Sequence, residues 1–250
     1  MINKISIIIP VYNEIIYFEQ SLKEIIELRL INNIKKEIII IDDFSTDGTV
    51  EKIKNFEINN DIEIKKIFHK KNQGKGMAIR SGINQMTGDY MIVRDADLEY
   101  VAQDINTLIN EVLVNKADVV YGSRFLTNKS HRILFFWHMV GNKFLTLLSN
   151  MINGLNFTDM ETCYKLVSKK ILDEINLYEN RFGFEPEITA KIAHLNKRKN
   201  LRIYEVGIAY NGRTYAEGKK INWRDGIAAI KCIIFYGFFR HKWIFLKIIH

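Results

Sequence analysis

The first half of the chain alternates short apolar runs with segments of helical periodicity. The apolar runs are rich in Ile and Val, which favours buried β-strands, and they cover residues 5–10, 37–42, 62–68, 90–94 and 119–123. Between them, apolar side chains recur at the spacing of one helix face over residues 15–30, 48–56, 75–86 and 102–114. This order predicts an α/β fold with a single Rossmann-like, mostly parallel sheet and helices on both faces.

The length and the even composition favour one main domain. The 250 residues show no internal repeat and no linker rich in Pro, Gly or Ser, so we expect a catalytic domain over residues 1–220. Residues 221–250 are expected to form an attached C-terminal amphipathic helical segment. Because no stretch reaches the roughly 18 uncharged apolar residues of a membrane span and no signal peptide is recognisable, we expect a cytoplasmic protein.

The charge balance favours an anionic partner. The formal net charge is +7, which suits a nucleotide or an anionic membrane surface. Nucleic acid is not expected, because no recognised motif or basic-aromatic stripe occurs and paired carboxylates would repel phosphate. The two cysteines, Cys163 and Cys232, lack metal-ligand spacing and indicate a reduced intracellular chain.

Polar residues cluster where the predicted strands end, which is where parallel sheets collect their ligands. Asp42 and Asp43 close the second strand and lead into a turn that contains Ser45 and Asp47. We expect Ser45 and Asp47 to cap the following helix. The carboxylates of Asp42 and Asp43 exceed what a cap requires and are candidates for ligand binding.

The turn after the third strand carries two glycines and two cations. Lys75, Gly76 and Arg80 belong to the stretch NQGKGMAIR, which opens a helix. Backbone amides at a helix N-terminus together with these cations would suit a phosphate. The spacing matches neither the P-loop nor the dinucleotide fingerprint.

The fourth strand is followed by the acidic stretch RDADLEY. Asp95 and Asp97, with Glu99 beyond them, offer oxygen ligands to a hard divalent cation such as Mg²⁺ or Mn²⁺. Such a triplet alone is common in solvated loops. Its position beside three other polar strand ends favours a nucleotide site with its metal.

Taken together, these motifs resemble the family 2 glycosyltransferases of the GT-A fold, and among them the dolichyl- and polyprenyl-phosphate hexose synthases. The resemblance rests on SIIIPVYNE, IIIIDDFSTDGT, NQGKGMAIRSGI, DADLEY, VVYGSRF, TDMETCYKLV, RFGFEPEITAKIA and GRTYAEGKKINWRDGI. These stretches run from residue 6 to about residue 230. Arg94 and the pair Val101 and Ala102 depart from the pattern, which bears on the loop after the acidic stretch.

The resemblance implies roles for particular residues. The nucleotide sugar would contact Pro10, Tyr12, Glu14, Asp42, Asp43, Lys75, Gly76, Arg80, Asp95, Ala96, Arg213 and Lys219. The metal ligands would be Asp95, Asp97 and Glu99, and the catalytic residues would be Asp97, Arg124, Asp159, Glu161 and Glu185. Glu185 is equally well explained as an acidic residue in a first helical turn.

The implied reaction moves a hexose from a nucleotide sugar of the UDP-glucose or GDP-mannose type to a polyprenyl or dolichyl phosphate, with inversion. A lipid phosphate is largely ionised at pH 7 and needs no general base, whereas a hydroxyl acceptor needs a carboxylate base. A transferase acting directly on a saccharide or protein therefore stays open as the alternative. A nucleotidyltransferase is a third reading.

The end of the chain bears on the acceptor. Residues 231–250 interleave aromatic and aliphatic side chains with Lys231, Arg240, Lys242 and Lys247. Such a helix can rest on an anionic leaflet, which predicts a peripheral protein on the cytoplasmic face of a membrane. A C-terminal helix packed on the core is the alternative. The sugar, the nucleotide base and the oligomeric state are left open.

Overall fold

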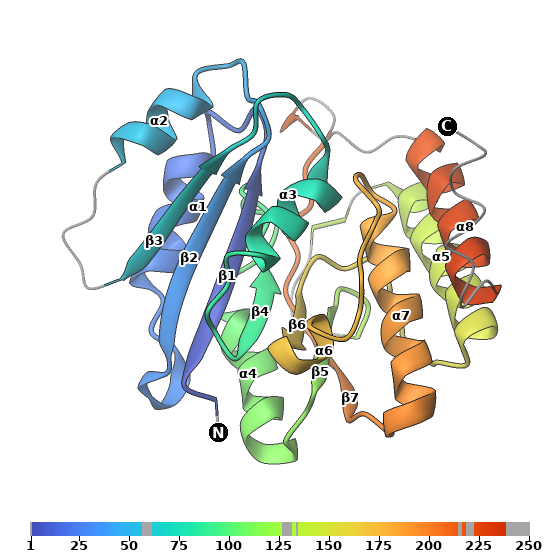
Figure 1. Cartoon of the computed structure of the whole chain (residues 1–250). Coiled ribbons are helices and arrows are strands. Elements are labelled where there is room, and N and C mark those ends of the chain that lie inside the picture. The colour runs from blue at the N-terminus through green and yellow to red at the C-terminus, as the bar shows by residue number, and fades with distance from the viewer. Residues whose placement is uncertain are drawn as a thin grey trace.

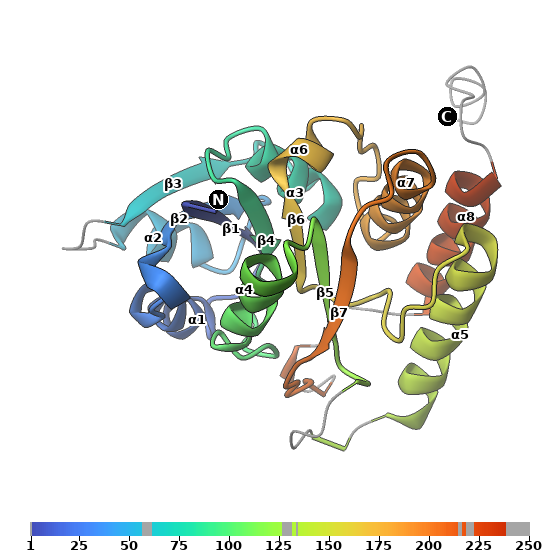
Figure 2. The same cartoon turned by 90° about the horizontal axis from the view of Figure 1, so that it is seen from below.

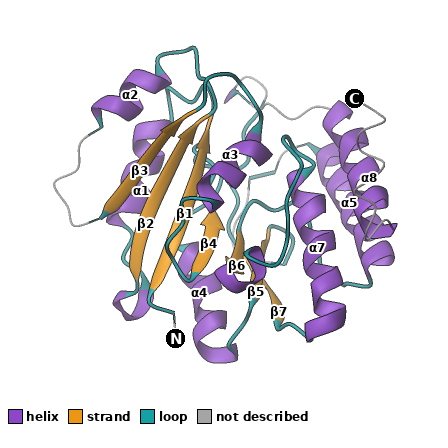
Figure 3. Ribbon diagram, in the orientation of Figure 1, coloured by secondary structure: helices purple, strands orange, loops and turns teal. Residues whose placement is uncertain are grey.

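The computed structural model describes residues 2–56, 62–126, 132–133, 135–214, 217–218 and 223–238, except for the side chains of residues 223 and 224. Figures 1 and 3 show a central sheet with helices on either side of it. The predicted position of Lys219 and the predicted segment from residue 239 onward lie outside these described residues.

The described residues form one seven-stranded sheet with the order β3-β2-β1-β4-β6-β5-β7. Its strands are β1 (Lys4–Val11), β2 (Lys35–Asp42), β3 (Glu63–Phe68), β4 (Tyr90–Val93), β5 (Val119–Ser123), β6 (Lys165–Ser168) and β7 (Ile203–Gly207). Every neighbouring pair is parallel except those that involve β6, which runs antiparallel to β4 and β5. The prediction of a mostly parallel sheet is therefore confirmed.

Helices cover both faces of this sheet, as predicted. They are α1 (Phe18–Glu27), α2 (Thr49–Asn55), α3 (Lys75–Ile83), α4 (Asp104–Asn115), α5 (Phe136–Asn153), α6 (Lys169–Leu172), α7 (Phe184–Lys199) and α8 (Trp223–Phe238), with a short 3-10 turn, η1 (Ile31–Asn33). Figure 2 shows α1 and α4 on one face of the sheet and α3, α6 and α7 on the other. In the same view, α5 and α8 form an outer pair beside α7.

The core follows from the isoleucine runs of the first strands. Ile7, Ile8 and Ile9 in β1 and residues 38–41 in β2 are almost completely buried, as expected for parallel strands covered on both faces. Within these two strands the buried polar side chains Ser6 and Glu37 lie near the strand starts and bond each other. Polar residues are therefore placed at the strand ends, and the carboxyl ends of the parallel strands share one edge of the sheet.

The helix α8 is the described part of the predicted C-terminal segment. It packs through Ala229 and Ile233 against α5, and Cys232 and Tyr236 lie with Ala190 of α7. One face of the segment is thus a packing surface. The division of the chain at residue 220 stays a prediction. No helix within the described ranges is long and apolar enough to cross a membrane.

Candidate active site

A cavity of about 1010 Å³ opens at the carboxyl-end edge of the sheet. Most of the residues singled out from the sequence line it: Pro10, Tyr12, Glu14, Asp43, Lys75, Asp95, Ala96, Asp97, Glu99, Arg124, Glu161, Glu185 and Arg213. The fold thus gathers side chains that are up to about two hundred positions apart. Asp42, Gly76, Arg80 and Asp159 do not line the cavity.

The acidic loop after β4 forms one wall of this cavity. Asp95 accepts a hydrogen bond from the Lys75 ammonium at 2.8 Å, so α3 supplies a counter-ion to the loop. Asp97 accepts a hydrogen bond from the backbone N–H of Glu99 at 3.1 Å. Between them, Leu98 has a left-handed backbone with φ of 61°. This tight turn keeps the carboxylates on one short segment.

Arg213 is the second cation of this wall, and it comes from the segment after β7. Its guanidinium lies 3.1 Å from Glu14 Oε2 and 3.1 Å from Asp97 Oδ2, and its Nε lies 3.6 Å from Glu99 Oε1. The backbone N–H of Arg213 also donates to Glu99 at 2.8 Å. The arginine therefore joins the ends of β1 and β4 to the chain that follows β7.

Negative charge is in excess at this wall. Four carboxylates, of Glu14, Asp95, Asp97 and Glu99, face the two cations Lys75 and Arg213. Burial and the charges of Asp95 and Glu99 raise the pKa of Asp97 to about 7. Burial opposes the ionisation of Asp95, but Lys75 holds its pKa below the ordinary value.

This donor set fits a divalent cation. Carboxylate oxygens are the ligands that Mg²⁺ and Mn²⁺ prefer, and an added cation would offset the repulsion that Asp97 experiences. Asp95 and Asp97 are the residues that would hold it. Within the described part of the chain, no three His, Cys, Asp or Glu side chains are already arranged as a metal site.

The end of β2 forms another part of the cavity wall. Asp43 accepts hydrogen bonds from the backbone N–H groups of Gln73 at 2.9 Å and Gly74 at 2.6 Å, and it contacts His69 at 2.7 Å. Asp42 instead accepts a hydrogen bond from the backbone N–H of Ser45 at 3.0 Å. Asp43 is thus the carboxylate of this pair that reaches the cavity.

The predicted capping residues of α2 have different partners. Asp47 accepts a hydrogen bond from the backbone N–H of Thr49 at 3.0 Å, which satisfies the first turn of the helix. The hydroxyl of Ser45 instead accepts one from the backbone N–H of Asn13 at 2.9 Å. The prediction that Ser45 caps α2 is wrong, because the chain reverses at Gly48 (φ of 93°) and leaves Ser45 beside the end of β1.

Of the two cations predicted for phosphate on α3, only Lys75 faces the cavity. Arg80 donates to the Leu177 carbonyl at 3.0 Å and to the Asn180 side chain. Arg80 therefore fastens α3 to the segment before α7. Gly76 lies against the same segment, since an added Cβ would stand 2.3 Å from the Glu179 carbonyl oxygen.

Arg124, directly after β5, is held by a buried carboxylate. It donates to both oxygens of Asp159 at 2.7 Å, and its guanidinium lies 5.1 Å from the ring centre of Tyr210. The two parallel hydrogen bonds fix the plane of the guanidinium. Asp159 thus orients Arg124 at the cavity wall and does not itself reach the cavity.

Two glutamates complete the charged half. Glu185, in the first turn of α7, forms an ion pair with the buried Lys165 of β6, and its Oε1 lies 3.9 Å from Lys75. Glu161 has one buried oxygen without a hydrogen-bond partner. Burial and the charge of Glu185 raise the pKa of Glu161 to about 7. Sequence reasoning missed Lys165. A lysine in a short strand is normally exposed to solvent, and nothing in the local sequence shows that this one is buried.

The other half of the cavity is mainly apolar, although Arg132, His138, Asn142, Lys143 and Asp225 also line it. It is lined by the segment that enters α5 and by α5 itself, with Phe135, Phe136, Trp137, Met139 and Leu145. Ala229 of α8 and Phe125 after β5 close it. A single cavity therefore joins an ionic wall to an apolar wall.

Comparison with known proteins identifies a family. The model of the family described as Glycosyl transferase family 2 matches residues 6–175. Undecaprenyl-phosphate 4-deoxy-4-formamido-L-arabinose transferase of Proteus mirabilis is 27% identical over 223 residues, which cover 87% of this chain and 63% of that protein. Dolichol-phosphate mannosyltransferase of Pyrococcus furiosus is 28% identical over 226 residues, which cover 87% of this chain and 60% of that protein.

A third relative is closer to this chain in length. UDP-N-acetylglucosamine–dolichyl-phosphate N-acetylglucosaminyltransferase of Methanococcus voltae is 28% identical over 236 residues, which cover 87% of this chain and 90% of that protein. The chain spans only about three fifths of the first two relatives.

Solved structures show the same fold. Glucosyl-3-phosphoglycerate synthase of Mycobacterium tuberculosis superimposes with a TM-score of 0.67 at 16% identity, over 94% of this chain and 78% of that one. At this identity the likeness concerns the fold, and it confirms the GT-A prediction.

Proposed function

Because the chain belongs to glycosyltransferase family 2, we propose that it transfers a hexose from a nucleotide sugar to a polyprenyl or dolichyl phosphate. UDP-glucose and GDP-mannose represent the proposed donors. The observation that carries this proposal is the cavity in which the ionic wall of Asp95, Asp97 and Arg124 continues into the apolar wall of α5. A phosphate attached to a long hydrocarbon chain matches both parts.

The nucleotide-sugar donor would bind along the ionic wall of the cavity. Asp95 and Asp97 would hold Mg²⁺ or Mn²⁺, which when bound neutralises charge on the departing nucleoside diphosphate. Lys75 and Arg213 would supply further positive charge to the same diphosphate. Pro10, Tyr12 and Asp43 also line the cavity and would surround the base and ribose.

The acceptor phosphate would approach Arg124, whose guanidinium is oriented by Asp159. A phosphate monoester is largely ionised at pH 7, so its oxygen can attack the anomeric carbon without a base. A new bond forms between this oxygen and the anomeric carbon, and the bond from that carbon to the nucleoside diphosphate breaks. Attack from the opposite face inverts the anomeric centre. Arg124 would offset the repulsion between the two phosphates.

Three relatives support the lipid acceptor. Their names specify undecaprenyl phosphate, dolichol phosphate and dolichyl phosphate. The apolar wall of Phe135, Phe136, Trp137 and Met139 would accommodate the first isoprene units of such a chain.

A lipid acceptor implies contact with a membrane. The outward face of α5 exposes Phe136, Trp137, Phe144, Leu147 and Met151, and α8 exposes Ile227, Ile234 and Phe238. The sequence of α5 contains no carboxylate, and Lys143 is exposed on it. The apolar face of α5, which carries Lys143 and no acidic side chain, suits an anionic leaflet, and the one carboxylate of α8, Asp225, lies in its first turn. We therefore propose peripheral association with the cytoplasmic face of a membrane through this face.

A donor and acceptor screen tests the proposal. The purified chain is incubated with Mn²⁺ or Mg²⁺ and UDP- or GDP-sugars, and nucleoside diphosphate release is measured with and without polyprenyl phosphate. We expect release from one donor that depends on both the metal and the lipid. Turnover without lipid stimulation would contradict the lipid acceptor, and no turnover of any donor would contradict the transferase proposal.

A second candidate acceptor, a hydroxyl of a saccharide or protein, is favoured by one observation. The carboxylate of Glu161 lines the cavity, where it could take the proton of a hydroxyl. Glu161→Gln separates the two reactions. Transfer to a phosphate would survive the substitution, whereas transfer to a hydroxyl would fall by about two orders of magnitude or more.

A further inference from the structure

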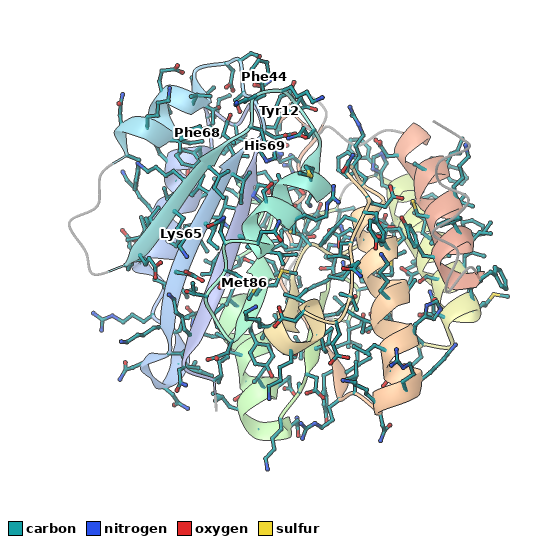
Figure 4. All side chains as sticks on the ribbon, in the orientation of Figure 1. Tyr12, Phe44, Lys65, Phe68, His69 and Met86 are labelled. Carbon is teal, nitrogen blue, oxygen red and sulfur yellow. The ribbon has the colours of Figure 1, made fainter. Side chains whose placement is uncertain are left out.

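A hydrogen-bonded chain of three side chains stands behind the wall formed by Asp43. His69 Nδ1 lies 2.7 Å from Asp43 Oδ1, and His69 Nε2 lies 2.9 Å from the hydroxyl of Ser81. The three residues come from the ends of β2 and β3 and from α3. Figure 4 labels both His69 and Tyr12 at the edge of the sheet toward which β1, β2 and β3 point.

The direction of each hydrogen bond follows from the chemistry of its partners. An ionised carboxylate only accepts, so Nδ1 of His69 carries the proton that is donated to Asp43. In the neutral imidazole Nε2 then accepts, and the Ser81 hydroxyl donates to it. Asp43 thereby fixes the tautomer of His69, and the contact with Ser81 on the other side helps to hold the plane of the ring. Neither residue lines the cavity, so both act through Asp43.

The protein leaves Asp43 with one unused acceptor position. Its Oδ1 accepts from His69 and from the backbone of Gln73, and its Oδ2 accepts from the backbone of Gly74. A carboxylate offers about four such positions. Because Asp43 lines the cavity while its side chain is 4% exposed, the fourth position is the one available to a ligand.

The backbone around Asp43 is held as firmly as its side chain. The backbone N–H of His69 donates to the Asp42 carbonyl at 2.9 Å, and the Asn72 amide donates to the Asp43 carbonyl at 3.2 Å. Rotation of the carboxylate would break its hydrogen bonds to three residues of the segment between β3 and α3. The geometry is that of an acceptor fixed in one orientation.

We propose that His69 and Ser81 are positioning residues that orient Asp43 to accept a hydrogen bond from a ring N–H of the donor's nucleobase. This rests on the proposed function, which places the base beside Tyr12 and Asp43. The ligand is the base of a nucleoside diphosphate that presents an imide or amide N–H, as both uracil and guanine do. His69 contributes to base recognition without touching the nucleotide.

Calorimetric binding of three probes with Mn²⁺ tests this proposal: UDP, GDP and inorganic pyrophosphate, which lacks a base. In His69→Ala we expect the preferred nucleotide to bind about tenfold more weakly. This corresponds to losing the hydrogen bond between the base and the charged Asp43 carboxylate. Pyrophosphate should bind unchanged. His69→Asn keeps a donor near the Nδ1 position and should restore most of the affinity. Ser81→Ala should show a smaller loss than His69→Ala.

His194→Ala is the matched control, because that histidine lies on α7 and contacts the Gly237 carbonyl. Methylation of the nucleotide at the ring N–H provides a second check, since the methylated ligand should bind wild type and His69→Ala equally. Equal losses for nucleotide and pyrophosphate would assign His69 a general structural role and overturn the proposal. Unchanged nucleotide binding in His69→Ala would overturn it as well.

The same measurements separate this proposal from the proposed function. If wild-type protein binds pyrophosphate but neither UDP nor GDP, the assignment of a nucleotide donor fails, and the role of His69 fails with it. If wild type binds a nucleotide and His69→Ala binds it equally, only the role of His69 fails.

Discussion

At the scale of single residues, a fully buried arginine stands directly before the acidic loop. Arg94 donates to the Tyr100 carbonyl and to the Tyr164 hydroxyl, and its other nitrogen lies 2.9 Å from Glu24 Oε2 on α1. The Arg94 side chain thus lies under the loop of residues 95–100 and links the end of that loop to α1. These contacts hold the acidic loop in one conformation from its buried side.

Replacing Arg94 should cost more stability than replacing its partner. Arg94→Met leaves the Tyr100 carbonyl and the Tyr164 hydroxyl without this donor, and we expect a loss of about 3 kcal/mol in the free energy of unfolding. Glu24→Gln should cost less than about 1 kcal/mol, because the Glu24 side chain is 39% exposed. Urea denaturation of both variants measures the difference. Equal losses would contradict this account of the loop.

Glu161 should make the stability of the protein fall as the pH rises toward neutrality. Burial and Glu185 raise the pKa of Glu161 from 4.5 to about 7. Between these values the folded form keeps a proton that the unfolded form has lost, so ionisation at higher pH costs stability. Glu161→Gln should therefore be more stable than wild type at pH 8 and equal to it at pH 4.

Urea denaturation at the two pH values tests the prediction for Glu161. The control is Glu51→Gln, which removes an exposed carboxylate on α2. A constant difference between wild type and Glu161→Gln at both pH values would show that Glu161 ionises normally.

Only some of the residues at the candidate site could be predicted from the sequence. Asp95, Asp97 and Asp43 were recognisable because each follows an apolar strand, and parallel strands bring their carboxyl ends together. The pairing of Asp97 with Arg213 was not recognisable, because it joins residues 116 positions apart. The inward direction of Lys165 likewise depends on packing against α7 and not on local pattern.

At the scale of elements, the start of α3 is fastened to the segment that precedes α7. The backbone N–H of Met77 donates to the Asn180 carbonyl at 3.0 Å, and Arg80 binds the same segment. Gly76 permits this approach, since a Cβ there would stand 2.3 Å from the Glu179 carbonyl oxygen and 2.9 Å from that of Arg181. Two elements that carry Lys75 and Glu185 are thereby held together.

Gly76→Ala should separate these two elements. The added methyl meets backbone oxygens that cannot rotate away, so we expect a loss of about 1–3 kcal/mol in stability. The control is Gly141→Ala on α5, where an added Cβ meets no atom within 4 Å. That change should stabilise the protein by about 0.5–1 kcal/mol. Thermal unfolding compares the stability of the two variants. A Gly76→Ala variant as stable as wild type would show that the segment before α7 can move to accommodate the methyl group.

Element prediction succeeded where periodicity was strong. The first five strands and first four helices follow the Ile and Val runs and the amphipathic spacing between them. The strands β6 and β7 were not predicted from the sequence. The strand β6 has only four residues and includes Lys165, and the apolar run of β7 is interrupted by Glu205. The antiparallel insertion of β6 between β4 and β5 is set by long-range packing.

At the scale of the whole molecule, the apolar faces of α5 and α8 should determine how the protein meets a membrane. Leu147→Glu and Met151→Glu place carboxylates on the exposed face of α5, at side chains that do not line the cavity. We expect both variants to sediment less with anionic vesicles, because the carboxylates oppose burial and repel the surface. Added salt should weaken wild-type binding as well.

Val114→Glu on α4 is the matched control for these variants. Val114 is 67% exposed, comparable to the 58% of Leu147 and the 73% of Met151, but it belongs to a helix on the face of the sheet that carries α1. Equal sedimentation of all three variants with vesicles would place the membrane contact elsewhere on the molecule.

The contact of Arg213 with Glu14, Asp97 and Glu99 has a consequence for the order in which ligands arrive. A tethered guanidinium is a competitor at high effective concentration, so under the proposed function a free divalent ion would have to displace Arg213 from Asp97 without compensation. A metal ion that arrived with a nucleoside diphosphate would offer the released arginine new oxygen partners. The exchange would therefore favour the metal–nucleotide pair over the free ion.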